Sequence, residues 1–196
     1  MTDTATPPRT PRPAGPRPKR APSPVLERLF ALYPRMFGAR FLPLKLGVYQ
    51  ELLALHPDDF KKEELKLALG QHARSTRYLE AVASGAPRHD LNAQPVEPVA
   101  PEHVHHAILE VYRRRLSRDK VAATQWLRVR LVAAIEASGL ARDAYLERMP
   151  TPDPVAAAVL DEAFAQLGER AAKNEALRRA FAASGKTVQE FAEMYG

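Results

Sequence analysis

Apolar side chains recur at helical spacing along most of this chain. In one stretch Leu44, Val48, Leu52 and Leu55 follow one another at intervals of four, four and three residues, which places them on one face of a helix. Similar stripes, separated by prolines and glycines, continue to the end of the sequence. The pattern predicts helices over residues 24–33, 43–56, 60–69, 76–82, 101–115, 119–138, 141–149, 154–167, 169–183 and 187–194.

Capping residues and prolines set the expected ends of these helices. Ser23 precedes a proline and suits the N-cap of the first helix, and Pro34 is expected to stop that helix. Asp58 or Asp59 is expected to cap the third helix, and Ser75 the fourth. The first half of the chain is therefore predicted to be a series of short, capped helices.

One segment departs from helical spacing. Residues 85–101 carry isolated apolar side chains separated by Pro95 and Pro98, and a turn is expected around Asn92 and Ala93. This is the only β element that the pattern supports, and it is predicted to be a short, irregular hairpin. The fold class predicted from the pattern is mainly α, with one β-hairpin followed by a helical C-terminal region.

Composition narrows the classes of protein. A chain of 196 residues with 45% hydrophobic content is long enough for one substantial core, or for one domain and an appendage. It contains no cysteine, which excludes disulfides, thiolate nucleophiles and cysteine-ligated zinc. No apolar run reaches the roughly 18 residues of a membrane span, and the N-terminus lacks the apolar core of a signal peptide. We therefore expect no membrane association and a cytoplasmic location.

The net charge of +6 is concentrated in the first part of the chain. Residues 1–24 carry five basic and one acidic side chain together with eight prolines, and residues 25–116 carry 13 basic and 11 acidic side chains. Residues 117–196 carry 11 of each. We expect residues 1–24 to form a disordered basic arm, which either contacts phosphates without a fixed site or only aids solubility.

The C-terminal region, residues 119–196, is predicted to be helical and amphipathic. It either docks on the preceding domain or forms a small bundle of its own. Its last part, with a glycine turn and a capping box of Thr187 and Glu190, has the outline of a helix-turn-helix. The second helix carries acidic side chains, which argues against DNA recognition. The region is a candidate surface for a protein partner.

The sequence contains no arrangement typical of catalysis. It has no H-E-x-x-H motif, no glycine-rich phosphate loop and no nucleophile–base pattern, so we expect neither enzymatic activity nor a cofactor. Three histidines, His103, His105 and His106, lie on one predicted helix, where His103 and His106 are spaced to share a face. Without a nearby cysteine or acidic pair, they are not expected to form a metal site.

The order of several short motifs carries a family resemblance. Pro-Leu-Lys-Leu-Gly occurs at residues 43–47, Arg-Tyr-Leu at 77–79, and Gly-Ala-Pro-Arg-His-Asp-Leu at 85–91, just before the expected hairpin turn. From about residue 29 to residue 115, the chain resembles the RNA-binding domain of the ProQ/FinO family of bacterial RNA chaperones. The resemblance implies a ProQ/FinO-like helical domain with a short β-hairpin. The expected divisions of the chain are residues 1–24, 25–118 and 119–196.

The resemblance also implies which residues contact RNA. It places a pocket for an RNA 3′ terminus at Tyr78 and Arg88, where the amides at the helix start near Ser75 and Thr76 are available to an anionic or polar end group. The arginines after residue 112 are expected to add non-specific attraction. The candidate RNA-binding residues are Lys45, Lys62, Lys66, Ser75, Thr76, Arg77, Tyr78, Arg88, Arg113, Arg114 and Arg115.

Several of these residues also have a purely structural interpretation. Tyr78 on an apolar helix face suits a core position, and Arg88 has an acidic neighbour in Asp90. The chain also departs from the family pattern at two positions, Gly70, where a basic residue is common, and Thr76, where an aromatic residue is common. We therefore expect a weaker duplex-facing surface, with the basic arm as compensation.

These expectations define two classes of function. The first is a non-enzymatic RNA-binding protein, or RNA chaperone, that grips a hairpin stem and its single-stranded 3′ tail. The resemblance implies small regulatory RNAs and messenger 3′ ends as its targets, and post-transcriptional regulation as its role. The second is a helical protein-interaction adapter with loose basic anchoring to nucleic acid. A positive concave face with Lys45, Tyr78 and Arg88 favours the first class, and an exposed apolar groove on residues 119–196 favours the second.

Overall fold

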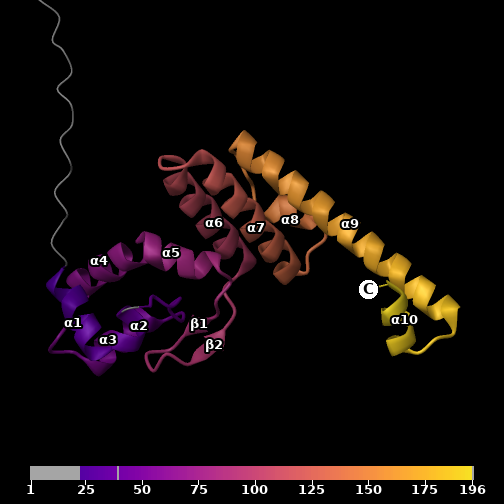
Figure 1. Ribbon diagram of the computed structural model, residues 1–196. Helices are drawn as coiled ribbons and strands as arrows, with labels where there is room; N and C mark the ends of the chain where they lie inside the picture. The colour runs from indigo at the N-terminus through magenta and orange to yellow at the C-terminus, as the bar shows by residue number, and fades with distance from the viewer. Residues whose placement is uncertain (1–22, 39, 196) are drawn as a thin grey trace, which may run out of the picture.

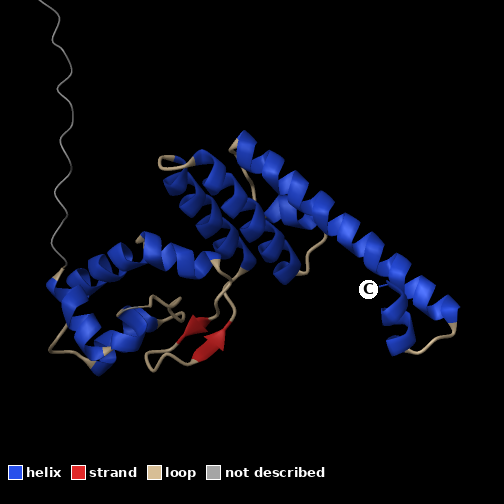
Figure 2. Cartoon of the chain, in the orientation of Figure 1, coloured by secondary structure: helices blue, strands red, loops and turns tan. Residues whose placement is uncertain are grey.

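The computed structural model of the protein describes residues 23–38 and 40–195. Helices dominate this part of the chain, and its only sheet is a two-stranded hairpin (Figure 2), which confirms the predicted fold class. None of the described helices is both long and apolar enough to cross a membrane. Apart from Ser23 and Pro24, the basic arm expected at residues 1–24 lies outside the described residues. The elements are α1 Pro24–Leu32, α2 Pro34–Phe37, α3 Val48–Leu55, α4 Lys62–Ala73, α5 Thr76–Ala83, β1 Arg88–His89, β2 Pro95–Glu97, α6 Pro101–Leu116, α7 Lys120–Ser138, α8 Arg142–Arg148, α9 Pro154–Ser184 and α10 Val188–Tyr195.

The helix predicted from residue 43 starts later, at Val48. Gly47 precedes it with a φ of 78°, in the left-handed region that favours glycine and ends helical geometry. The preceding residues are extended instead, because Leu44 forms a parallel β-bridge with His89. The amide of Lys45 donates to the His89 carbonyl at 2.9 Å. The first motif of the chain is therefore a strand-like segment beside the hairpin.

Of two other expected helix ends, the stop before Pro34 is confirmed and the cap at Asp58 or Asp59 is not. Pro34 does follow α1, but it also begins α2, because a proline at the first helical position loses no helical hydrogen bond. The residue that precedes α4 is Lys61, and neither aspartate before it caps the helix. Asp59 instead forms an ion pair with Arg28 at 3.0 Å, which links α1 to the turn before α4.

The turn of the hairpin is as predicted. Ala93 has a φ of 60°, and the Asp90 carboxylate accepts hydrogen bonds from the amides of Asn92 and Gln94, both at 2.9 Å. These bonds replace ladder bonds that the short strands cannot supply. The antiparallel pair of β1 and β2 pairs residue 88 with residue 97, so the turn chemistry sets the position of Arg88.

The C-terminal region docks on the preceding domain. α7 lies along α6, and α9 packs against α7 (Figure 1). The buried side chains of α7 belong to the same hydrophobic core as those of α6, whereas Val121, in the first turn of α7, is 69% exposed. The helix after residue 154 is also continuous to Ser184, whereas two helices were predicted with a break near Gly168. One internal glycine costs a helix only about 1 kcal/mol, which is too little to interrupt this alanine-rich segment.

The second half of α9 extends away from the rest of the molecule, and α10 folds back beside its end (Figure 1). The rings of Phe181 and Phe191 meet at a centroid distance of 5.2 Å. The predicted capping box is confirmed, since the Glu190 carboxylate accepts from the Thr187 amide at 2.9 Å and the Glu190 amide donates to the Thr187 hydroxyl. We call residues 169–195 the C-terminal hairpin.

Candidate nucleic-acid interface

The start of α5 sends consecutive side chains in different directions. Ser75 caps the helix, as predicted, and its hydroxyl accepts a hydrogen bond from the Tyr78 amide at 3.2 Å. Arg77 lies on the exposed side, with its guanidinium 4.5 Å from the centre of the Phe41 ring. Tyr78 points inward. Because of this divergence, one turn of helix joins the core to a cationic surface.

Tyr78 is a buried residue, with 9% of its surface exposed. Its hydroxyl accepts a hydrogen bond from the backbone amide of Leu44 at 3.0 Å, and burial raises the pKa of this hydroxyl. The phenol is therefore uncharged near neutral pH and keeps one proton to donate. The side chain also lines a cavity of about 210 Å³ between α5, α6 and the hairpin.

Arg88 lines the same cavity and is bonded on three sides. Its guanidinium donates to the Leu44 carbonyl at 2.9 Å, contacts Nδ1 of His103 at 3.2 Å and lies 3.8 Å from the Glu97 carboxylate. Asp90, the partner suggested by the sequence, is occupied by the hairpin turn. Arg88 is thus held by the extended segment, β2 and α6 together.

The histidines of α6 divide between two environments. His103 and His106 line the cavity that also holds Tyr78 and Arg88. His105 faces the other way and is buried, with Nδ1 3.0 Å from the Tyr145 hydroxyl, and burial lowers its pKa to about 4. Among residues 23–38 and 40–195, no three metal-ligating side chains converge.

The three candidate lysines are arranged differently. Lys45 forms an ion pair with Glu51 at 2.8 Å. Lys62 and Lys66 are exposed one turn apart on α4, and neither has an ion pair in the described part of the chain. The two lysines therefore present adjacent cations to solvent, at the spacing at which helical side chains share a face.

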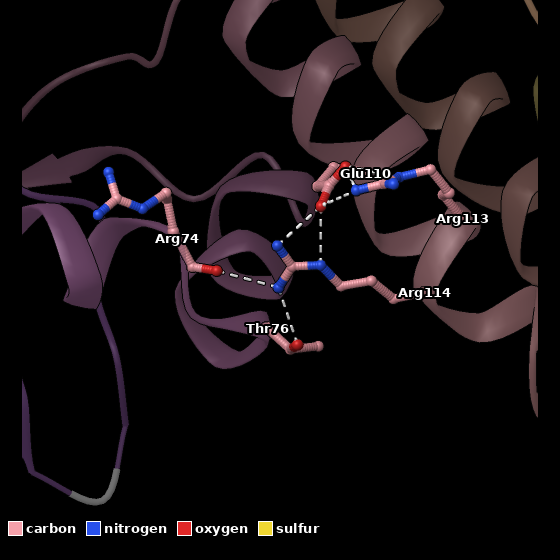
Figure 3. A network of polar contacts seen from close by, with 5 residues as sticks. All are labelled: Arg74, Thr76, Glu110, Arg113 and Arg114. Atoms are coloured by element: carbon pink, nitrogen blue, oxygen red, sulfur yellow. Dashed lines mark hydrogen bonds and ion pairs between the residues drawn. The ribbon is translucent and has the colours of Figure 1, made fainter. Parts of the chain in front are cut away.

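The arginines at the end of α6 bind acidic neighbours and α5. Arg113 and Arg114 both contact Glu110, and the bond from Arg113 is the main cause of the lowered pKa of this carboxylate. Arg114 also donates to the hydroxyl of Thr76 and to the carbonyl of Arg74, each at 3.0 Å (Figure 3). Arg114 therefore bridges α6 to the start of α5, while the Arg113 side chain stays largely exposed.

Arg74 is a residue that the sequence analysis missed. A Cβ added at Gly70 would lie 3.3 Å from Nη1 of Arg74, so the Arg74 guanidinium covers the position where the family often has a basic residue. Arg74 follows Gly70 by four residues, the spacing at which side chains of a helix are neighbours. This spacing, together with the missing cation at Gly70, could have identified Arg74 from the sequence. Phe41, which lies under Arg77, gave no such signal, because its contact spans a loop.

The structure thus brings some candidate residues together and separates others. Tyr78 and Arg88 share one cavity, while Thr76 joins Arg114 at the nearby start of α5. Lys62 and Lys66 stand apart, with α4. A helix start, an exposed cation and a cavity with hydrogen-bond donors are groups that bind phosphates and unpaired nucleotides.

Comparison with known proteins agrees with this architecture. The profile of the ProQ/FINO family matches residues 20–124, more than half of the chain. The helical domain with its hairpin and basic surface therefore has an identity: the chain belongs to the ProQ/FinO family.

Relatives in this family are named RNA chaperone ProQ. The one from Shewanella frigidimarina is 37% identical over 103 residues, which cover 50% of this chain and 49% of that protein. The one from Shewanella baltica is 33% identical over 141 residues, covering 68% and 66%, and the one from Aliivibrio salmonicida is 41% identical over 83 residues, covering 41% and 38%. Across most of these matches, the chain spans about half the length, or less, of the curated relatives.

A solved structure of a FinO-like RNA chaperone from Neisseria meningitidis is also similar. It is 34% identical, covers 42% of this chain and 85% of its own, and superposes with a TM-score of 0.39. The profile ends at residue 124, so most of α7 and all of α8, α9 and α10 lie beyond the matched family segment.

Proposed function

We propose that this protein is a non-enzymatic RNA-binding protein that recognises a hairpin stem together with its single-stranded 3′ tail. Its membership of the ProQ/FinO family supports this proposal. The proposed role is that of a cytoplasmic RNA chaperone in post-transcriptional regulation, with small regulatory RNAs and messenger 3′ ends as targets. The observation that carries the proposal is the shared cavity of Tyr78 and Arg88 beside the start of α5.

Recognition of the 3′ end is assigned to this cavity. The Arg88 guanidinium supplies hydrogen-bond donors at the wall of the cavity, and His103 and His106 present exposed rings at the edge of the cavity. An unpaired terminal nucleotide offers a base for stacking and hydroxyl groups for hydrogen bonds. The start of α5, with Ser75 and Thr76, is the proposed contact for a phosphate or hydroxyl of the tail.

Recognition of the stem is assigned to cations without sequence selectivity. A-form RNA hides its base edges in a deep groove, so proteins bind its shape through phosphates and 2′-hydroxyls. The exposed cations Lys62 and Lys66 of α4, with Arg77 of α5, are the proposed phosphate contacts, and Lys45, Arg113 and Arg115 are secondary ones because each has an acidic partner. In this scheme residues 25–118 form the RNA-binding domain, after a basic arm at residues 1–24.

A comparison of three RNAs tests the proposal. The purified protein is expected to bind a stem-loop with a short 3′ uridine tail more tightly than the same stem made blunt, or extended past its 3′ end by a duplex. Equal affinity for all three RNAs, measured by fluorescence anisotropy at one salt concentration, would contradict end recognition. Absence of binding to any of them would overturn RNA binding itself.

A protein partner is the second candidate function for the C-terminal region. Leu177, Val188 and Met194 of the C-terminal hairpin are 45%, 73% and 58% exposed, although they are apolar. Exposed apolar side chains on a projecting element favour contact with another macromolecule. Copurification with and without residues 169–196 tests this role, and an unchanged set of bound proteins would exclude it.

A further inference from the structure

Two cavities lie where α5 and α7 flank α6. Both helices pack against α6, and the cavities open between them, one at each end. The first, of about 200 Å³, is lined by Thr76 of α5, by Arg118 in the turn between α6 and α7, and by Ala122 of α7. The second, of about 330 Å³, is lined by Gly85 after α5 and by Arg130 of α7, among others.

One arginine from each cavity contacts the ring of Trp126. Arg115 lines the first cavity and places its guanidinium 4.8 Å from the centre of the Trp126 ring. Arg130, which lines the second cavity, lies 5.9 Å from the same ring. We call the two cavities with Arg115 and Trp126 the α5–α7 groove. From Ala122 to Ser138, its lining spans 17 residues of α7, or about 24 Å of helix.

The groove has an excess of positive charge. Arg114 and Arg115 are paired with Glu110 and Glu80, but the guanidinium groups of Arg118 and Arg130 have no ion pair or hydrogen bond within the described residues. The remaining acid of the groove, Asp119, accepts a hydrogen bond from an amide as the N-cap of α7. One unpaired cation therefore faces the cavity at each end of the groove, Arg118 in the first and Arg130 in the second. Both complement an anionic ligand.

The middle of the groove suits a flat ligand. Trp126 is partly buried, and an arginine lies near its ring from each end of the groove. Unpaired bases stack both on aromatic rings and on guanidinium planes, whereas an acidic peptide would use the arginines but not the ring. Small side chains of α7 line both cavities, Ala122 the first and Ala133 and Ala137 the second.

We propose that the α5–α7 groove binds a single-stranded segment of the RNA, with phosphates at Arg118 and Arg130 and a base against the Arg115–Trp126 pair. The proposal rests on the proposed function and adds a second contact surface to it. Trp126 and Arg130 lie beyond the matched family segment, so this surface is completed by the C-terminal region. It gives that region a direct role in RNA binding.

Trp126 is the only tryptophan of the chain, so its fluorescence reports on the groove directly. Titration of the full-length protein with a short uridine oligonucleotide that has no stem is expected to quench or shift the Trp126 emission. The double variant Arg118→Ala, Arg130→Ala is expected to bind this RNA about tenfold more weakly. Its plot of log affinity against log salt concentration is expected to be flatter by about 1.4, because each lost single-strand phosphate contact removes about 0.7.

The matched control removes two cations elsewhere. Lys173→Ala, Arg178→Ala changes the net charge equally at exposed positions of α9 that have no ion pair in the described part of the chain, and it should leave affinity almost unchanged. If the tailed stem-loop binds while Trp126 emission is constant and both double variants behave alike, the groove proposal is wrong and the proposed function stands. If neither RNA binds, both fall. A polyglutamate peptide that changes the emission when RNA does not would assign the groove to an acidic protein partner and overturn the RNA proposal.

Discussion

Tyr78 and Arg88 hold the two backbone polar groups of one residue, Leu44. The Tyr78 hydroxyl accepts from the Leu44 amide at 3.0 Å, and the Arg88 guanidinium donates to the Leu44 carbonyl at 2.9 Å. The residues proposed to receive an RNA 3′ end therefore also fix the extended segment beside the hairpin. Substitution at either position has consequences for stability as well as for binding, and the two effects must be measured separately.

Arg88→Ala is expected to weaken binding of the tailed stem-loop by about 1.5–3 kcal/mol, the usual contribution of a hydrogen bond to a charged group. The blunt stem should lose much less affinity, because it has no unpaired 3′ end to place in the cavity. Anisotropy titrations of both RNAs, at a temperature where circular dichroism shows the variant folded, provide the measurement. Equal losses for both RNAs would mean that Arg88 does not read the 3′ end.

Tyr78→Phe is expected to lower the free energy of unfolding by about 1–3 kcal/mol, because the buried Leu44 amide loses its acceptor. Tyr49→Phe is the matched control, since its hydroxyl makes an exposed 3.3 Å bond to a carbonyl, and it should change stability by only about 0.5 kcal/mol. Urea denaturation of both variants distinguishes them. Tyr78→Ala removes a buried ring and is expected to cost about 3–5 kcal/mol, so it is unsuitable for RNA-binding assays.

Stability is expected to fall as the pH drops from 6.5 to 4. Burial lowers the pKa of both His72 and His105 to about 4 in the folded protein, below the ordinary histidine value of about 6.5. In this window the unfolded chain binds protons that the folded chain does not, so the stability present above pH 6.5 is lost with a slope of up to about 1.36 kcal/mol per pH unit for each histidine. Urea denaturation at several pH values measures the slope. His72→Phe should reduce it, and an unchanged slope would show that His72 does not contribute.

Removing residues 119–196 is expected to destabilise the RNA-binding domain, whereas removing only residues 169–196 is not. Leu127 and Leu131 of α7 are fully buried in the core shared with α6. A fragment of residues 1–118 would therefore expose the apolar face of α6 that α7 covers. Residues 169–179 are exposed along α9, and the C-terminal hairpin packs mainly on itself. Thermal unfolding of the two fragments and the full chain provides the comparison, and equal midpoints for all three would contradict it.

Deleting residues 1–22 is expected to weaken RNA binding modestly and similarly for all stems. The deletion keeps Ser23 and Pro24, which form the start of α1, so the fold should be unchanged. The lost segment carries Arg9, Arg12, Arg17, Lys19 and Arg20. These side chains are expected to add affinity by releasing counterions from the RNA phosphates, without contacting particular nucleotides. A flatter salt dependence is expected. Lost discrimination between tailed and blunt stems would show that the arm takes part in end recognition.

Much of the fold could be predicted because it depends on local spacing. The apolar positions of α6 and α7, the cap at Ser75 and the turn at Asn92 and Ala93 are all properties of neighbouring residues. The start of α3 and the unbroken α9 could not be predicted in this way. The first depends on pairing between Leu44 and His89, distant in sequence, and the second on a glycine that the surrounding helix tolerates.

The sequence by itself determined the family, most of the helices and the hairpin, because periodicity, capping and motif order are written in consecutive residues. Only the tertiary structure decided what the candidate side chains touch. It gave the Tyr78 hydroxyl to the Leu44 amide, set Arg114 against Thr76, and brought Trp126 beside Arg115 when α7 docked on α6. The physical reason is that polar pairing follows from the packing of whole helices. Residues 34 or 38 positions apart meet only after the apolar faces that carry them have been buried together.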